Sequence, residues 1–241
     1  MLFLAVLGAT LALVALLQPI IKRAPVMLYL IAAALDVLYL AAIMGWLSPA
    51  WNSFAVITVR RGLAAVALFV IVMYIGVLSH GSAPRRFFGR IRADLAIAGC
   101  ILIAGHVISY GVQYLGRLIT GQLGSAALAL SFIFGVILVA LTVVLGITSF
   151  RRVRRAMDAT LWLRIQRWAY VFYGLLWAHA ALLLLPSALA GLSTATLNLV
   201  IYTAVFGIYA ILRVARAAAD RRTLAEVSRL REDELSTQLQ A

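Results

Sequence analysis

Long apolar runs separated by short polar connections dominate the chain. Each run predicts one membrane span of about 20 residues, which as a helix crosses about 30 Å of hydrocarbon. An open backbone is too costly in lipid, and the runs lack the alternation of barrel strands. We therefore expect an all-α polytopic transmembrane helix bundle with about seven spans. The runs cover residues 2–20, 27–46, 62–79, 94–116, 125–150, 168–186 and 194–212.

The composition supports a multi-pass protein of the cell membrane. Of 241 residues, 65% are hydrophobic and 12% are charged. A soluble domain is closer to half apolar and a quarter charged. These proportions exclude both an ordinary soluble fold and a disordered chain.

The basic residues gather in alternate connections. One set of connections and the C-terminal tail hold 18 Lys and Arg residues, whereas the opposite set holds 3, namely Arg60, Arg61 and Arg117. Because cytoplasmic loops collect basic residues, we expect the N-terminus outside and the C-terminus in the cytoplasm. The same rule accounts for the net charge of +13 without nucleic acid as a partner.

Two of the three histidines lie inside apolar runs, at similar distances from the predicted cytoplasmic side. His106 is 12 residues beyond Asp94, and His179 is 11 residues beyond Trp168. Two neutral imidazoles at one level can hold a planar metal cofactor between two helices. Haem iron accepts two axial histidines, an arrangement suited to electron transfer. Alternatively, each histidine only hydrogen-bonds a neighbouring helix. Zinc is disfavoured because its sites require three or four protein ligands.

Two segments around these histidines resemble the ferric-reductase-like transmembrane family, which includes the haem-binding membrane subunit of periplasmic methionine-sulfoxide reductase systems. The first segment, RIRADLAIAGCILIAGHVISY (90–110), has a basic residue, a span, then His and Tyr. The second, TSFRRVRRAMDATLWLRIQRWAYVFYGLLWAHAALL (148–183), has Thr-Ser, a basic cluster, Trp, and a His further along. The matching residues are Arg92, His106, Tyr110, Thr148, Ser149, Arg151, Arg152, Trp162, Arg164, Arg167, Tyr170 and His179.

The resemblance implies that His106 and His179 are ligands of a b-type haem and bind its iron. Two-haem members carry a second histidine about thirteen residues from the first on one helix, where this chain has Gln166. Glutamine is a poor iron ligand, so we expect one haem. The resemblance divides the chain into two N-terminal transmembrane helices with an outer loop (1–60), a haem-binding domain (61–212) and a cytoplasmic tail (213–241).

The tail and two further polar residues complete the set of candidates. An apolar stripe predicts that the tail is an amphipathic helix that binds the membrane surface or a partner. Asp36 is the only acid at the centre of a run; it is either a proton site or a protonated acid bonded to a carbonyl. His80, at the cytoplasmic end of its run, is either solvated or in contact with a quinone or donor protein. The stripe consists of Leu224, Val227, Leu230, Leu235 and Leu239.

We therefore expect a membrane-bound b-type cytochrome that carries electrons from a cytoplasmic or quinone donor to an acceptor at the outer face. The chain shows no Gly-x-Gly-x-x-Gly motif, so an oxidoreductase activity would need a separate reductase partner or membrane quinone. Two other functions stay open: a transporter or channel subunit centred on Asp36, and a non-redox membrane scaffold.

Overall fold

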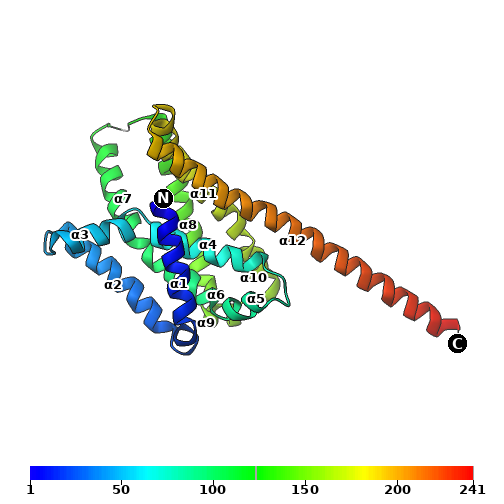
Figure 1. Ribbon diagram of the computed structural model, residues 1–241. Coiled ribbons are helices and arrows are strands. Elements are labelled where there is room, and N and C mark those ends of the chain that lie inside the picture. The colour runs from blue at the N-terminus through cyan, green and yellow to red at the C-terminus, as the bar shows by residue number, and fades with distance from the viewer. Residues whose placement is uncertain (123, 241) are drawn as a thin grey trace.

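The computed structural model describes residues 1–122 and 124–240, and this part of the chain contains helices and no β-strand (Figure 1). Glycine-containing turns separate several of the apolar helices, whereas a single residue such as Ala24 or Ile103 separates others. The elements are α1 (Leu2–Arg23), α2 (Pro25–Ile43), α3 (Pro49–Ala55), the π-helical turn η1 (Val56–Arg60), α4 (Leu63–Val77), α5 (Ala83–Phe88), the 3₁₀ turn η2 (Gly89–Ile91), α6 (Arg92–Leu102), α7 (Ala104–Ile119), α8 (Ala126–Ser149), α9 (Arg151–Ala156), α10 (Ala159–Gln166), α11 (Trp168–Leu189) and α12 (Ser193–Gln240).

The prediction of an all-α membrane bundle with about seven spans is confirmed. Six helical stretches of the described chain are long and apolar enough to cross a membrane. A seventh crossing is formed if α3–η1 and α4, which are bent by 41° relative to each other, count as one broken span. Residues 49–60, which we expected to form an outer loop, are therefore helical. Pro49 stands at the first position of α3, where its fixed φ favours a helix start.

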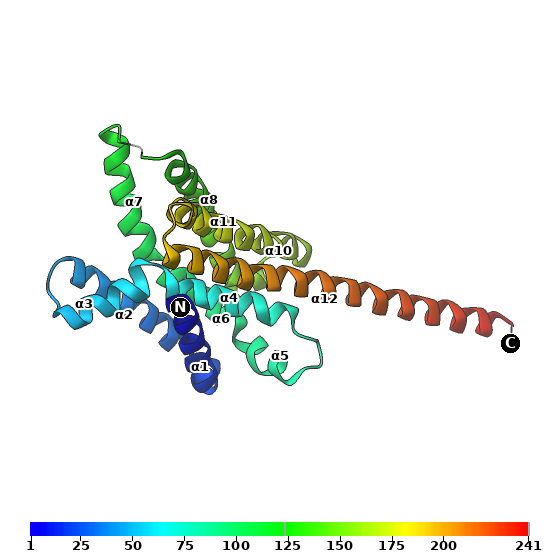
Figure 2. The same ribbon diagram turned by 45° about the horizontal axis from the view of Figure 1, so that its top comes forward.

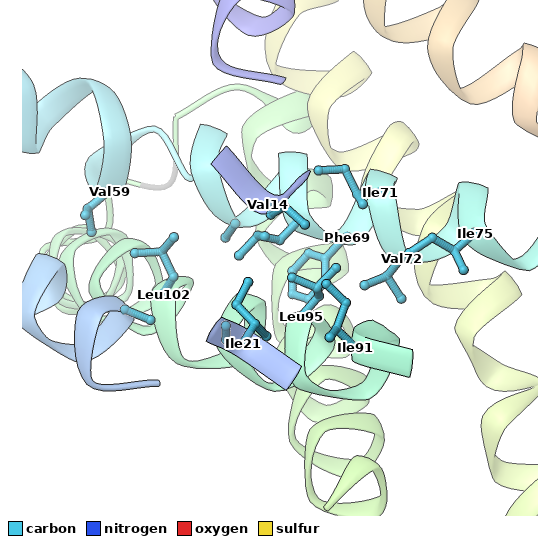
Figure 3. Close-up of a cluster of buried hydrophobic side chains, with 14 of the residues drawn as sticks. Val14, Ile21, Val59, Phe69, Ile71, Val72, Ile75, Ile91, Leu95 and Leu102 are labelled. Atoms are coloured by element: carbon cyan, nitrogen blue, oxygen red, sulfur yellow. The ribbon is translucent and has the colours of Figure 1, made fainter. Parts of the chain in front are cut away.

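Helix α4 lies at the centre of the bundle. Its sequence, LAAVALFVIVMYIGV, is apolar on every side, which is typical of a helix buried all round. Eleven of its fifteen residues are buried, and it packs against α1, α6 and α12. Figure 3 shows Phe69, Ile71 and Val72 of α4 among side chains from other elements, including Val14, Leu95 and Ile91.

Two of the spans are interrupted. A break at Ile103 separates α6 from α7, and a break at Arg167 separates α10 from α11. Each break precedes the helix that carries a candidate histidine. Backbone hydrogen bonds continue across both breaks, from Ile103 N–H to Gly99 O and from Arg167 N–H to Leu163 O.

Helix α12 continues from the last span into the tail without interruption, and its C-terminal half projects away from the other helices (Figures 1 and 2). The boundary expected at residue 213 thus falls inside one helix. Val227 is exposed. The side chains of Leu224, Leu230, Leu235 and Leu239, which carry the rest of the predicted stripe, lie outside the described residues.

Candidate functional site

His106 is the third residue of α7, just beyond the break at Ile103. Its Nδ1 lies 2.8 Å from the backbone carbonyl oxygen of Arg60, the last residue of η1. Because a carbonyl oxygen only accepts, Nδ1 carries the proton and donates it. The neutral ring therefore has its lone pair on Nε2, which bonds to no described residue.

Gly62 makes this close approach of η1 to His106 possible. Its φ of +66° lies in the left-handed region, which favours glycine. A Cβ atom at this position would lie 3.3 Å from His106 Nδ1 and 3.1 Å from Ile103 Cδ1. The turn between η1 and α4 thus accepts no larger residue without displacing the imidazole or the backbone.

His179 lies in the middle of α11 and has the same hydrogen-bond pattern. Its Nδ1 lies 2.9 Å from the backbone carbonyl oxygen of Ser131 in α8, so it donates to that oxygen. The Ser131 hydroxyl lies 3.0 Å from the same nitrogen. Again Nε2 keeps its lone pair and bonds to no described residue.

His106 lies on α7, and His179 lies on α11, which packs against α8. The α6–α7 chain also contacts α8 at two points. At one, the Cys100 Sγ approaches the backbone of Gly146, where an added Cβ would lie 3.0 Å away. At the other, the rings of Tyr114 and Phe132 stack with their centroids 3.8 Å apart.

The positions of the histidines along α8 differ from the equal-depth prediction. His106 falls between Cys100 and Tyr114 on the α6–α7 chain, whereas His179 contacts Ser131 and lies beside Gly135, close to the Phe132 end. His179 is therefore displaced toward the Tyr114–Phe132 contact. Residue counts within each run do not determine how far α7 and α11 are shifted along α8, because that shift depends on how the helices pack.

The donor set fits a haem iron better than a metal ion held by protein alone. A ligating histidine almost always donates its second ring nitrogen to a carbonyl or carboxylate, which fixes the tautomer and the ring orientation. His106 and His179 both do so. Among the described residues, no cluster of three or more His, Cys, Asp or Glu side chains is placed to hold a metal ion. Two imidazoles without further protein ligands suit a cofactor that brings its own equatorial nitrogens.

Asp36, on α2, lies against the segment that leads into His106. Its Oδ1 is buried and has no hydrogen-bond partner among the described residues. A Cβ atom on Gly105 would lie 2.8 Å from this oxygen. A second contact joins the same helices, since the hydroxyl oxygens of Tyr39 and Ser109 are 2.7 Å apart. The structure thus brings the candidate proton site beside the backbone of the residue before His106.

The other motif residues of the second segment gather at the end of α8. Gln166 Nε2 donates to Thr148 Oγ1 at 3.0 Å. Trp162 Nε1 donates to the Thr148 carbonyl at 3.0 Å, and the Arg154 guanidinium lies over the Trp162 ring. Gln166 is therefore engaged in joining α10 to α8.

The remaining candidates lie elsewhere. His80 is at the surface, where its Nε2 lies 3.7 Å from Asp220 Oδ1 on α12. Arg92 donates from Nε to the Val72 carbonyl at the C-terminal part of α4. Tyr110 lies next to His106, with ring centroids 4.9 Å apart.

Three groups with structural contacts here were not among the candidates predicted from the sequence. Ser131 is 1% exposed, and the one signal for it was a lone hydroxyl within the apolar start of α8. Asp94 is also buried, accepting from Tyr29 Oη at 2.8 Å and facing Arg151 Nη2 at 3.7 Å. The Arg60 carbonyl, a backbone group, left no signal in the sequence.

Part of the chain is similar to a known family of membrane proteins. Residues 61–177 match the family described as "Ferric reductase like transmembrane component". The match includes His106 and ends two residues before His179. An uncharacterized protein of Treponema pallidum (strain Nichols) is 37% identical over 222 residues, which are 90% of this chain and 61% of that relative. The chain thus spans about three fifths of that relative's length. No solved structure matches the chain.

Proposed function

We propose that the chain is a membrane b-type cytochrome with one haem bound by His106 and His179, because residues 61–177 match the ferric reductase like transmembrane family. A membrane redox-related function follows from the family. The haem, its two ligands and the direction of electron flow are the proposal. When bound, the haem would supply one-electron chemistry, and the protein would supply ligation, burial and orientation.

The observation that carries the proposal is the matched hydrogen bonding of two imidazoles on separate helices. His106 donates to the Arg60 carbonyl at 2.8 Å and His179 to the Ser131 carbonyl at 2.9 Å. Each bond orients the ring and leaves Nε2 available as an iron ligand. A histidine that served only to join two helices could donate from either ring nitrogen, whereas both of these donate from Nδ1.

The side chains at the other family positions support one haem rather than two. Gln166 already donates to Thr148, and an amide is a weak ligand for iron beside imidazole. Arg92, fourteen residues before His106, donates to the Val72 carbonyl. A guanidinium cannot be deprotonated in a protein and so offers no lone pair. Neither residue can complete a second pair of ligands.

We further propose that electrons reach the site from a cytoplasmic redox protein or a membrane quinone and leave at the outer face. Arginines of α5, α9 and α10 are concentrated on the connections predicted to be cytoplasmic. Positive potential of this kind accelerates the approach of an acidic donor protein. Asp36, beside Gly105, is the candidate proton site of the same proposal.

The test is the cofactor content of the full chain purified from a haem-replete host. We expect Soret and α bands of a low-spin b-type haem after reduction with dithionite, at about one haem per chain. A colourless protein would overturn the cytochrome proposal and favour a scaffold or a transporter centred on Asp36. A content near two haems per chain would contradict the roles of Gln166 and Arg92.

A further inference from the structure

A basic pocket lies between the C-terminal end of α1 and the α5–η2 segment, which are neighbours in both views (Figures 1 and 2). Its volume is about 410 Å³, and Lys22 and Arg23 line it from α1. Arg86 and Arg90 line it from α5 and η2. These two arginines also border a second hollow, beside His80 and Arg85.

A buried polar contact holds the two walls of the pocket together. Gln18, which is 7% exposed, donates from Nε2 to the Phe87 carbonyl oxygen at 3.0 Å. A long-range bond of this kind fixes α1 against α5 and therefore fixes the spacing of the two basic pairs. The pocket is a built feature of the fold rather than a chance meeting of mobile side chains.

The four cations lack a carboxylate partner in the described part of the chain. The ion pairs found there join His80 and Arg216 to Asp220, and Arg151 to Asp94. Like charges held around one space repel each other, and the repulsion is removed when an anion lies between them. Arginine forks match the oxygens of phosphate, so the lining favours a phosphate group.

The outer surface of α1 next to the pocket is apolar. Leu16 and Ile20 are 76% and 49% exposed, and they lie on the same face of the helix as Arg23, two turns and one turn away respectively. Phe87 at the pocket is also exposed. Because α1 is long and apolar enough to span the membrane, this strip would face acyl chains directly above the cations.

From this combination we propose that the pocket binds the phosphate headgroup of an anionic phospholipid, whose acyl chains lie along Leu16 and Ile20. Basic pockets between spans at the cytoplasmic surface recognise such headgroups. A soluble phosphate compound would use the cations but gain nothing from the apolar strip. The site is independent of the haem proposal.

The experiment is native mass spectrometry of the full-length chain in detergent, with added phosphatidylglycerol, phosphatidylcholine or inorganic phosphate. We expect the wild type to retain phosphatidylglycerol at least tenfold better than phosphatidylcholine. The double variant Arg86→Gln/Arg90→Gln should retain phosphatidylglycerol at least tenfold less well than the wild type. The double variant Arg221→Gln/Arg222→Gln on the exposed part of α12 removes the same charge elsewhere and should bind as the wild type does.

Other outcomes would overturn the proposal. Equal loss in both double variants would mean that total charge, not this pocket, attracts the lipid. Displacement of the lipid by an equal concentration of inorganic phosphate would assign the pocket to soluble phosphate. If size-exclusion chromatography shows that Arg86→Gln/Arg90→Gln does not fold, Lys22→Gln/Arg23→Gln replaces it. If Lys22→Gln/Arg23→Gln retains phosphatidylglycerol as well as the wild type does, the proposal is wrong.

Discussion

Oδ1 of Asp36 lies against the backbone of Gly105, the residue that precedes His106. A Cβ atom on Gly105 would lie 2.8 Å from that oxygen and 2.6 Å from Val59 Cγ1, so only glycine fits between α2 and η1 here. The oxygen is buried and has no hydrogen-bond partner among the described residues. An acid so placed is costly in a membrane unless it is protonated or serves a function. Its proximity to a proposed haem ligand makes the functional alternative testable.

Replacing Asp36 with Asn should remove the pH dependence of the haem reduction potential. If the carboxyl takes up a proton when the site is reduced, the wild-type potential falls with rising pH, by at most about 59 mV per unit for a one-electron couple. Asn has the same shape but no ionisable proton, so its potential should be flat. Redox titration between pH 6 and 8 measures this, with Asp220→Asn as the surface control. An unchanged slope in Asp36→Asn would assign Asp36 a structural role.

Replacing either His106 or His179 with Ala should abolish the low-spin haem spectrum, because each change removes one of the two proposed iron ligands. His80→Ala is the matched control. It removes the third histidine, which faces Asp220 at the surface, and should leave the spectrum and the haem content unchanged. Absorption spectra of the reduced proteins make the comparison. If His106→Ala and His179→Ala both keep the haem spectrum of the wild type, the ligand assignment is wrong.

Gly62→Ala should lower the haem content of the protein, whereas a glycine replaced at a similar φ away from the histidine should lower only the stability of the fold. Alanine at a positive φ costs roughly 1–2 kcal/mol, and its Cβ would also lie 3.3 Å from the His106 ring. Gly45 provides the control, since its φ is +75° but nothing lies within 4 Å of an added Cβ. Gly45→Ala should therefore lower the melting temperature and keep full haem content. Similar haem loss in both variants would mean that backbone strain alone is responsible.

The membrane spans could be predicted from the sequence because lipid leaves few solutions for a long apolar run. Leu63–Val77 shows this most clearly, since a segment apolar on all sides has to be a helix and here lies in the centre. Helical structure at Pro49–Arg60 was missed because the polar residues around Asn52 and Arg60 are typical of a loop. Beyond the start at Pro49, its packing against α2, α4 and α7 explains why it is helical.

For the candidate site, the sequence indicated the two histidines and Asp36 but not what surrounds them. The partners that orient His106 and His179 are backbone carbonyls of Arg60 and Ser131. Every residue has a carbonyl, so no side-chain pattern can reveal which one a distant imidazole reaches. The contact of Asp36 with Gly105 likewise depends on how α2 crosses α7, which sequence spacing within either helix does not determine.

Asp94→Ala should destabilise the bundle, although Asp94 does not contact the candidate site. Asp94 is 4% exposed. Its loss leaves the Tyr29 hydroxyl without its acceptor. An unsatisfied buried polar group costs about 1–3 kcal/mol. The change Asp220→Ala removes ion pairs with His80 and Arg216 near the surface, each of which should contribute no more than about 1 kcal/mol. Thermal unfolding followed by circular dichroism should rank Asp94→Ala clearly below Asp220→Ala, and the reverse order would contradict the role given to Asp94.

Asp158 should make the helix that carries Gln166 sensitive to acid. Its carboxylate caps α10, accepting from the hydroxyl of Thr160 and from the backbone N–H groups of Thr160 and Leu161 at 3.0 and 2.9 Å. The hydrogen bond from the Thr160 side chain, followed by those from the backbone, lowers the pKa of Asp158. A lowered pKa in the folded state means that the capping stabilisation is present above the unfolded pKa near 4. It is lost as the pH falls through the folded value.

Asp158→Asn separates this charge effect from capping itself, because Asn also caps helices well. We expect the variant to keep α10 at neutral pH and to lose the part of the acid sensitivity due to Asp158. Asp158→Ala should fray α10 at every pH and loosen the contact of Gln166 with Thr148. Hydrogen exchange of the α10 amides between pH 3 and 7, corrected for intrinsic exchange rates, measures both effects. Identical protection of α10 in the wild type and Asp158→Ala would contradict the capping role, since the carboxylate would then contribute nothing to the start of the helix.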